Sequence, residues 1–335
     1  MIVLDERWTR RRVITILAAS AALPLAGSAG KAGGPEPYRW QGIALGAKAD
    51  LTLYAASRGE AATAIDAALA EMARLEAIFS LHQPGSALVR LNRDGLLVDP
   101  PVELQALLSQ ALELSDLSGG CFDPTIQPLW RLLADHFAKP GADPAGPPAA
   151  MLAAARALVD HRGVIVAADR IALARPGMQV SLNGIAQGYV SDRVAGLLQA
   201  RGFGPALVNL GEILALGRKP DGSGWRIGLA APGVAAQSVE EVEITVGAVA
   251  TSAARGLLFD ASGRFNHIID PTRLACAARD RSVSVLAPTA ATADGLSTLA
   301  ALLPDPERDL PRHLARFGAR AYLRSGPQAP GVWLG

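Results

Sequence analysis

The spacing of apolar residues predicts three helices along the chain, and a helix-start signal predicts a fourth. Apolar positions recur at helical spacing from Glu60 to Phe79, from Pro101 to Leu117 and from Ile185 to Arg201. Gly119-Gly120 follows the second of these runs and ends it. Pro288 and Thr289 follow an apolar run and mark the start of a fourth helix.

The remaining apolar runs predict strands. They are Trp40 to Tyr54 (strand, turn, strand), Val164 to Leu173 (a strand pair), Ala206 to Leu216, Trp225 to Ala230, Val239 to Val249, Leu257 to Asp260 and Phe265 to Ile269 (a hairpin around Ala-Ser-Gly), and Arg281 to Ala287. Lys139 to Pro148 is rich in Pro and Gly and predicts a loop. Because strands and helices do not alternate strictly, we expect an α+β fold, with mixed sheets and packed helices.

Composition narrows the class of protein. The 335 residues are 50% hydrophobic and 19% charged, which is typical of a globular chain and not of a disordered one. A net charge of +1 argues against a nucleic-acid partner or an electrostatic membrane surface. Cys121 and Cys276 permit one disulfide, but we expect both to be small buried hydrophobic residues, and no His/Cys cluster indicates zinc.

The N-terminal segment indicates export. Thr9-Arg-Arg-Arg12 precedes an apolar run from Val13 to Ala26, and small residues follow that run. This pattern resembles a twin-arginine signal over residues 1–29 and predicts a periplasmic protein with no membrane span after cleavage. A short N-terminal membrane anchor is the alternative, although the run is short for a full span.

One pair of residues indicates a metal site. Asp294 and Thr298 are four residues apart in the fourth helix and would share one face. A carboxylate and a hydroxyl are hard oxygen ligands of the kind that Mg²⁺ prefers. Such a pair alone is more often a solvated helix face.

Four further segments carry polar residues that chemistry uses. They are Phe79-Ser-Leu-His82 to Asn92, Gly119-Gly-Cys121-Phe122-Asp123, Ser181-Leu-Asn-Gly184-Ile-Ala-Gln187-Gly, and His267-Ile-Ile269-Asp270-Pro-Thr. Each has a plainer interpretation: a helix end, a tight turn capped by Asp123, an ordinary strand-to-helix turn, and a structural histidine. Three residues apart in a strand, His267 and Asp270 would face opposite sides, so their direct pairing is doubtful.

Together, these five segments resemble the motifs of the ApbE family, the FAD:protein FMN transferases, in order and approximate spacing. The resemblance runs from about Gln41 to Leu303 and implies a flavin transferase domain over residues 38–335. It implies that the protein binds FAD and Mg²⁺, splits the pyrophosphate and attaches FMN through a phosphoester bond to a Thr or Ser of a partner flavoprotein.

The resemblance also implies roles for individual residues. The residues expected to contact FAD are Leu45, His82, Cys121, Phe122, Asp123, Ser181, Gln187 and Ile269. The expected metal ligands are the Gly184 carbonyl, Asp294 and Thr298, with Ser297 nearby. His267 is the candidate base for the incoming hydroxyl, because an imidazole suits that task near neutral pH, and Asp270 is the second candidate.

The chain departs from the family pattern in the fourth segment, where Pro271-Thr-Arg-Leu274 lacks the Thr-Gly step, and at two positions of the third segment. Ser181 replaces an acidic residue and Gln187 a lysine, so one negative and one positive charge are lost together. With Asn209-Leu-Gly-Glu212, this form resembles the NosX branch, which is taken to flavinylate NosR during nitrous oxide reductase maturation in denitrification. Two alternatives remain open: an FAD pyrophosphatase, and a non-catalytic FAD-binding accessory protein.

Overall fold

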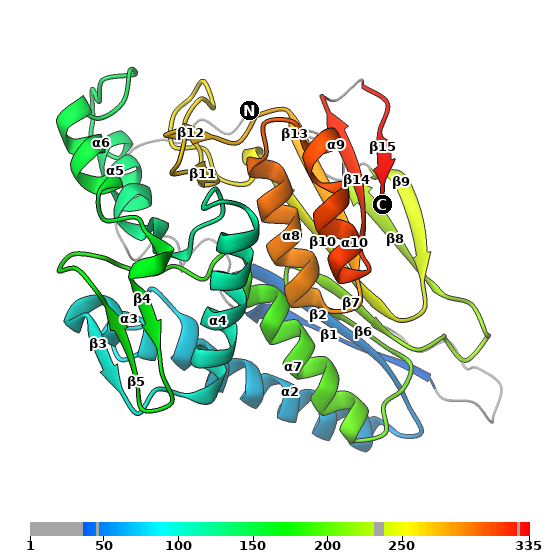
Figure 1. Ribbon diagram of the computed structural model, residues 1–335. Helices are drawn as coiled ribbons and strands as arrows, with labels where there is room; N and C mark the ends of the chain where they lie inside the picture. The colour runs from blue at the N-terminus through cyan, green and yellow to red at the C-terminus, as the bar shows by residue number, and fades with distance from the viewer. Residues whose placement is uncertain (1–35, 45–46, 231–237, 327–328) are drawn as a thin grey trace.

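The computed structural model describes residues 36–44, 47–230, 238–326 and 329–335 (Figure 1). The strands are β1 Glu36–Ala44, β2 Ala47–Ala55, β3 Leu96–Val98, β4 Val164–Val166, β5 Arg170–Leu173, β6 Ala206–Asn209, β7 Ile213–Leu216, β8 Trp225–Ala230, β9 Ser238–Ile244, β10 Gly247–Ala253, β11 Ile269–Asp270, β12 Ala275–Cys276, β13 Arg281–Ala287, β14 Arg320–Ser325 and β15 Val332–Leu334. The helices are α2 Arg58–Phe79, α3 Ala87–Asp94, α4 Val102–Leu117, α5 Gln127–Phe137, α6 Ala149–Arg156, α7 Ala186–Ala200, α8 Ala290–Leu302, α9 Pro306–Asp309 and α10 Pro311–Phe317, with short 3-10 turns η1 Pro124–Ile126, η2 His161–Gly163 and η3 Ala254–Gly256.

The centre of the fold is an eight-stranded sheet in the order β1-β2-β6-β7-β10-β13-β14-β15. Every strand pairing within the described ranges is antiparallel. Side chains alternate between its faces: Ala248 and Ala250 of β10 enter the main core, whereas Val249 packs with Trp225 and Ile227 of the β8–β9 hairpin. The hairpin therefore covers one face of the sheet and leaves the other to helices.

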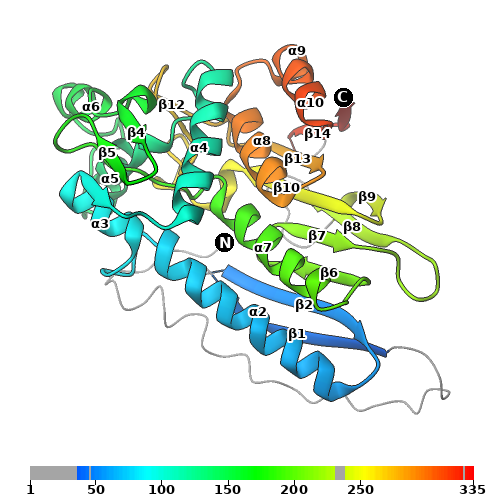
Figure 2. The same ribbon diagram turned by 60° about the horizontal axis from the view of Figure 1, so that its bottom comes forward.

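Three helices lie across that other face. Figure 2 shows α2, α7 and α8 side by side over the sheet, and α7 and α8 both contact its strands. Helix α8 is buried nearly all round, since it lies between the sheet, α7 and α4. Its N-terminus is capped by the Thr289 hydroxyl, which accepts a hydrogen bond from the backbone N–H of Thr292.

The α+β expectation is confirmed, and most predicted elements lie where the pattern placed them. The predicted helices correspond to α2, α4, α7 and α8, and the predicted strand pairs to β1–β2 and β4–β5. Both cysteines are free, with Cys121 buried and Cys276 half-buried. No helix within the described ranges is both long and apolar enough to cross a membrane.

Two apolar runs that predicted single strands are each two strands. Ala206 to Leu216 is the hairpin β6–β7, because Gly211 turns the chain at φ +110°, in the left-handed region that favours glycine. Val239 to Val249 divides at Gly247, also at positive φ, so that β9 pairs with β8 and β10 joins the large sheet. In the second turn Val246 is apolar although it is exposed, so the apolar run continues through that turn.

Other segments were missed or only partly predicted. The segment after Phe79 contains helix α3, capped by the Ser86 hydroxyl, and α5 was not predicted at all. The expected hairpin from Leu257 to Ile269 reduces to one isolated bridge, Leu258 to Asn266. Residues 1–29, with the predicted export signal, and Leu45 lie outside the described residues.

Candidate active site

The site begins where α7 and α8 cross in close contact. A Cβ placed on Gly188 of α7 would lie 2.3 Å from the Ala290 carbonyl oxygen, so only glycine allows this approach. One turn further along α7, the Asp192 carboxylate accepts hydrogen bonds from the backbone N–H groups of Ala290 and Ala291. The start of α8 is therefore fixed against the first turns of α7.

Asp294 and Thr298 share one face of α8, as their spacing predicted, and that face meets the start of α7. The Asp294 Oδ2 accepts a hydrogen bond of 3.0 Å from the Gly188 backbone N–H. The Thr298 hydroxyl donates to the Gly184 carbonyl at 3.4 Å. The Ser297 hydroxyl contacts the Ser252 hydroxyl of β10 at 2.8 Å. All four expected metal ligands therefore lie in one cluster.

Asp294 is a buried carboxylate whose environment disfavours its charge. Burial, followed by repulsion from Asp192, raises its pKa to about 7, and the hydrogen bond from Gly188 lowers it only in part. No positively charged side chain of the described residues contributes to this balance. The Asp294 carboxylate, two hydroxyls and a main-chain carbonyl together form a set of oxygen donors that fits Mg²⁺. The absence of a basic side chain acting on Asp294 among the described residues leaves its charge available for a cation.

The tight turn that carries Phe122 closes on the same cluster. A Cβ on Gly184 would lie 3.3 Å from the Phe122 ring and 3.1 Å from the Thr298 methyl group. Gly184 therefore allows an aromatic ring, a main-chain carbonyl and the Thr298 side chain to meet. Three of the five sequence segments converge at this point.

Asp123 performs the turn-capping role that was its plainer interpretation. Its Oδ1 accepts hydrogen bonds from the Thr125 backbone N–H and hydroxyl, at 2.8 and 2.6 Å. Its Oδ2 accepts from the His161 backbone N–H at 3.0 Å. Both oxygens of this buried carboxylate thus hold protein groups, and its expected contact to FAD stays a prediction.

Sequence reasoning missed His161, which contacts both ends of this turn. Its Nε2 lies 3.0 Å from Asp116 at the end of α4, and its Nδ1 lies 3.3 Å from Asp123. A Cβ on Gly120 would touch its ring. The only signal in the sequence was the two carboxylates that flank Gly119-Gly120, Asp116 and Asp123. Nothing in the sequence pattern connected these carboxylates to position 161.

His267 is oriented as a base through its second nitrogen. Its Nδ1 lies 3.0 Å from the Leu257 carbonyl oxygen, which only accepts, so Nδ1 carries the proton and the Nε2 lone pair is available. Burial lowers the pKa of His267 below its usual value, which keeps the ring neutral near pH 7. The hydrogen bond to Leu257 opposes this shift only partly.

Asp270 does not pair with His267 and instead accepts hydrogen bonds within the turn that follows it. Its Oδ1 accepts hydrogen bonds from the Thr272 backbone N–H and hydroxyl, at 2.8 and 2.6 Å. Its buried Oδ2 has no hydrogen-bond partner among the described residues. A Cβ on Gly120 would lie 3.8 Å from the Thr272 methyl group, so the turn of Asp270 lies beside the Phe122 turn. Burial, and to a smaller extent Asp270, raises the pKa of the Cys121 thiol.

Asn92, at the end of the segment that begins at Phe79, fixes the backbone that leads into the Ser181–Gln187 segment. The Asn92 side chain of α3 donates to the Val180 carbonyl at 2.8 Å and accepts from the Val180 N–H at 2.6 Å. This pair fixes the backbone that leads into Ser181 and Gly184. His82, by contrast, is exposed in the loop before α3.

Ser181, Gln187 and Ile269, the remaining residues expected to contact FAD, lie in three different environments. Ser181 is half-buried, and its hydroxyl faces the Asn183 N–H at 3.4 Å. Gln187 packs on Gly211 of the β6–β7 turn, at the metal-ligand end of α7. The Ile269 side chain is buried with Leu129, so its main chain is the part free to face a ligand.

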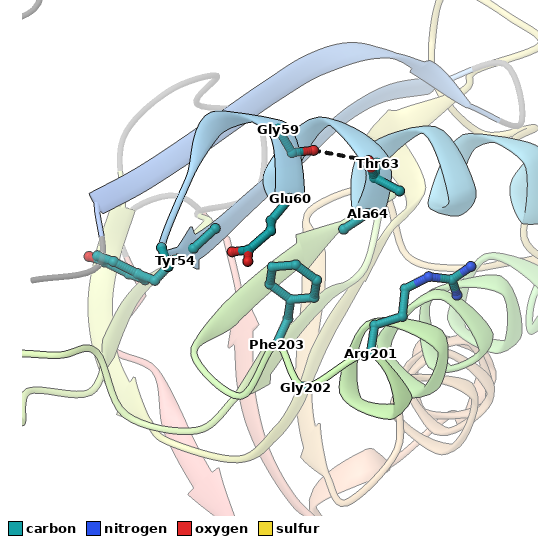
Figure 3. A pocket seen from close by; sticks show the side chains of 10 residues that line it. Tyr54, Gly59, Glu60, Thr63, Ala64, Arg201, Gly202 and Phe203 are labelled. Atoms are coloured by element: carbon teal, nitrogen blue, oxygen red, sulfur yellow. Dashed lines mark hydrogen bonds between the residues drawn. The ribbon is translucent and has the colours of Figure 1, made fainter.

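A separate cavity of about 640 Å³ opens at the other end of α7. Figure 3 shows Glu60, Phe203 and Arg201 in its wall, near the start of α2. At 1.5 Å per residue, it lies roughly 20 Å along α7 from Gln187. It holds none of the predicted site residues and is distinct from the cluster.

Comparisons with known proteins show which family the chain resembles. The ApbE family matches residues 45–317. A protein of Treponema pallidum named FAD:protein FMN transferase is 34% identical over 265 residues, 71% of each chain, and a Vibrio cholerae protein of the same name is 34% identical over 226 residues, 65% of this chain and 67% of that one.

The fold is also similar to that of solved structures. A flavinyl transferase ApbE of Pseudomonas stutzeri in its apo form has a TM-score of 0.75 at 27% identity, covering 91% of this chain and 96% of the other. A flavin transferase ApbE of Vibrio cholerae has the same TM-score at 25% identity, covering 89% of this chain and 96% of the other.

Proposed function

The chain belongs to the ApbE family and is an FAD:protein FMN transferase, and we propose that it works with Mg²⁺ at the α7–α8 crossing on a Thr or Ser of a periplasmic flavoprotein. One observation carries this proposal. The Phe122 ring and the Thr298 side chain, from two other segments, both lie within 3.3 Å of the point that a Cβ of Gly184 would occupy.

The reaction has one bond to form and one to break. The acceptor hydroxyl oxygen bonds to the phosphorus of the FMN half of FAD, the bridging P–O bond breaks, and AMP leaves. The hydroxyl proton passes to Nε2 of His267, whose Nδ1 is held by Leu257. Asp270 is the second candidate for this role.

Mg²⁺ would be held by the Gly184 carbonyl, Asp294 and Thr298, with Ser297 beside them. Bound there, it would neutralise phosphate charge, which is the main requirement of phosphoryl transfer. Residues proposed to bind FAD are Leu45, His82, Cys121, Phe122, Asp123, Ser181, Gln187 and Ile269. The amide of Gln187 offers hydrogen bonds without the positive charge of the usual lysine.

Features of the sequence support a proposal for the acceptor and its compartment. The paired arginines before Val13 support twin-arginine export of residues 30–335 to the periplasm. The Asn209 to Glu212 segment and the Ser181 and Gln187 replacements support a NosX-like enzyme. We therefore propose a NosR-like membrane flavoprotein as the acceptor.

Mass spectrometry of acceptor domains tests this function. A NosR-like domain coexpressed with the protein should gain FMN on one Thr or Ser, and its fluorescence should survive denaturation. Replacing that residue with Ala should abolish the label. Other periplasmic flavoprotein domains, tested in parallel, would identify a different acceptor if they alone gained the label.

The loss of charge at Ser181 and Gln187 favours one alternative, a non-catalytic FAD-binding accessory protein. The purified protein incubated with FAD, Mg²⁺ and acceptor would then release no AMP. An FAD pyrophosphatase would release AMP equally well without acceptor. The transferase should instead release AMP in step with labelling of the acceptor.

A further inference from the structure

Glu212 is a second buried carboxylate near the metal-ligand cluster, and the five sequence segments do not include it. It lies in the turn between β6 and β7, with its side chain in the protein interior at 8% exposure. Its neighbour Gly211 packs on Gln187, next to the Gly188 that binds Asp294. The turn therefore abuts the start of α7 from the side of the sheet.

The surroundings of Glu212 offer almost nothing to balance its charge. Its Oε2 has no hydrogen-bond partner within the described part of the chain. Burial, followed by repulsion from Asp294, raises its pKa well above the usual range, and only the Thr251 backbone N–H opposes this. Thr251 precedes Ser252, whose hydroxyl contacts both Ser297 and Thr298.

Two carboxylates buried close together without a basic side chain are costly for the folded state. An uncompensated buried charge destabilises the folded state, and proteins normally pair it or use it to bind a metal. Neither Glu212 nor Asp294 has a positively charged side chain acting on it among the described residues. A divalent cation between them removes this cost.

We propose that Glu212 supplies a second carboxylate to the cation site, binding the same divalent cation as Asp294 from the β6–β7 turn. The inference rests on the proposed Mg²⁺ dependence. It adds a negative charge from the turn between β6 and β7, an element that carries none of the expected ligands. A site with two carboxylates holds a divalent cation more tightly than a site with one.

Binding of Mn²⁺, measured by electron paramagnetic resonance with and without FAD and with no acceptor, tests the proposal. Glu212→Gln, which keeps the shape and removes the charge, should weaken Mn²⁺ binding about 10- to 100-fold. Glu212→Asp, which keeps the charge, should bind Mn²⁺ more tightly than Glu212→Gln. Glu243→Gln is the matched control, because its exposed carboxylate lies on β9 and should leave binding unchanged.

The outcomes separate this inference from the proposed function. If the wild type binds Mn²⁺ and Asp294→Asn does not, the metal site stands, and Glu212→Gln then decides the role of Glu212. Unchanged affinity in Glu212→Gln overturns the inference, as does an equal loss in the Asp and Gln variants. Absence of binding by the wild type overturns both. Without Mn²⁺, Glu212→Gln should unfold at no lower temperature than the wild type, which shows that any lost affinity is not lost folding.

Discussion

The backbone N–H of Gly188 donates a 3.0 Å hydrogen bond to the Asp294 carboxylate, across the contact between α7 and α8. The absence of a side chain at Gly188 brings the two helices together, and that contact places Asp294 beside the Gly184 carbonyl and Thr298. Packing and the geometry of the proposed metal site thus depend on the same few atoms.

Gly188→Ala should therefore lower both the stability of the protein and the affinity of the proposed metal site. The new methyl group would collide with the Ala290 carbonyl, and such overpacking costs about 1–3 kcal/mol of unfolding free energy. We expect weaker Mn²⁺ binding as well, because α8 must move away from α7. Gly196→Ala, on the same helix with open space around it, is the control and should stabilise by up to about 1 kcal/mol. Equal stability of the two variants in urea would contradict the close contact.

Asp294→Asn should remove metal-dependent transfer while keeping the fold. The amide oxygen can still accept from Gly188, but the charge that holds the cation is lost. We expect AMP release with acceptor to fall at least about 100-fold. Circular dichroism should remain that of the wild type. Full activity in this variant would exclude Asp294 as a metal ligand.

His267→Ala should slow transfer without preventing FAD binding. Loss of a positioned base reduces the rate of proton transfer steps by roughly 10²–10⁴. Flavin fluorescence titration should give an FAD affinity close to that of the wild type. If affinity collapsed and the rate at saturating FAD did not change, His267 would be a binding residue instead.

The pH dependence of transfer should reflect the neutral imidazole of His267. Burial lowers its pKa below 6.5, so Nε2 is unprotonated at pH 7, and the rate should decline only as the pH falls below 6.5. Measurements of AMP release at saturating Mg²⁺ from about pH 5 to 8 would locate this decline. A midpoint above 6.5 would contradict the assigned environment, and His267→Ala should lack the decline.

Asn92→Ala should loosen the segment that leads to Gly184. It leaves both the N–H and the carbonyl of Val180 without their partner, at a cost of about 1–3 kcal/mol. Urea unfolding would measure this loss. Asn183→Ala, an exposed change a few residues away, should stay close to the wild type. A similar small effect for both would show that the Asn92 pair contributes little.

The sequence predicted elements that depend on local spacing. Apolar periodicity located α2, α4 and α7, and Pro288-Thr289 marked the start of α8. The four-residue spacing of Asp294 and Thr298 correctly placed them on one helix face. Turns inside apolar runs were missed, because the Gly211 turn is short and the apolar residues Leu210 and Ile213 lie directly on either side of it. Glycine at 211 and 247 was the available signal, since both residues lie at positive φ.

Contacts between segments that are distant in the sequence could not be predicted from the pattern of apolar and polar residues. Nothing near His161 predicts that it bridges Asp116 and Asp123, and nothing near Glu212 predicts a neighbour at Asp294. Most of the expected ligands were identified through the resemblance to the ApbE family and not from the sequence pattern alone. The burial of Glu212, which gives that residue its chemistry, comes only from the assembled sheet and helices.

The sequence separations within the cluster determine when it can form. Gly188 and Asp294 are 106 residues apart, and Gly184 and Thr298 are 114 apart. Closing loops of this length costs entropy before any contact repays it, so such contacts form late during folding. We expect a refolding chain to regain helical signal first and cation affinity last, which would keep partly folded molecules from consuming FAD.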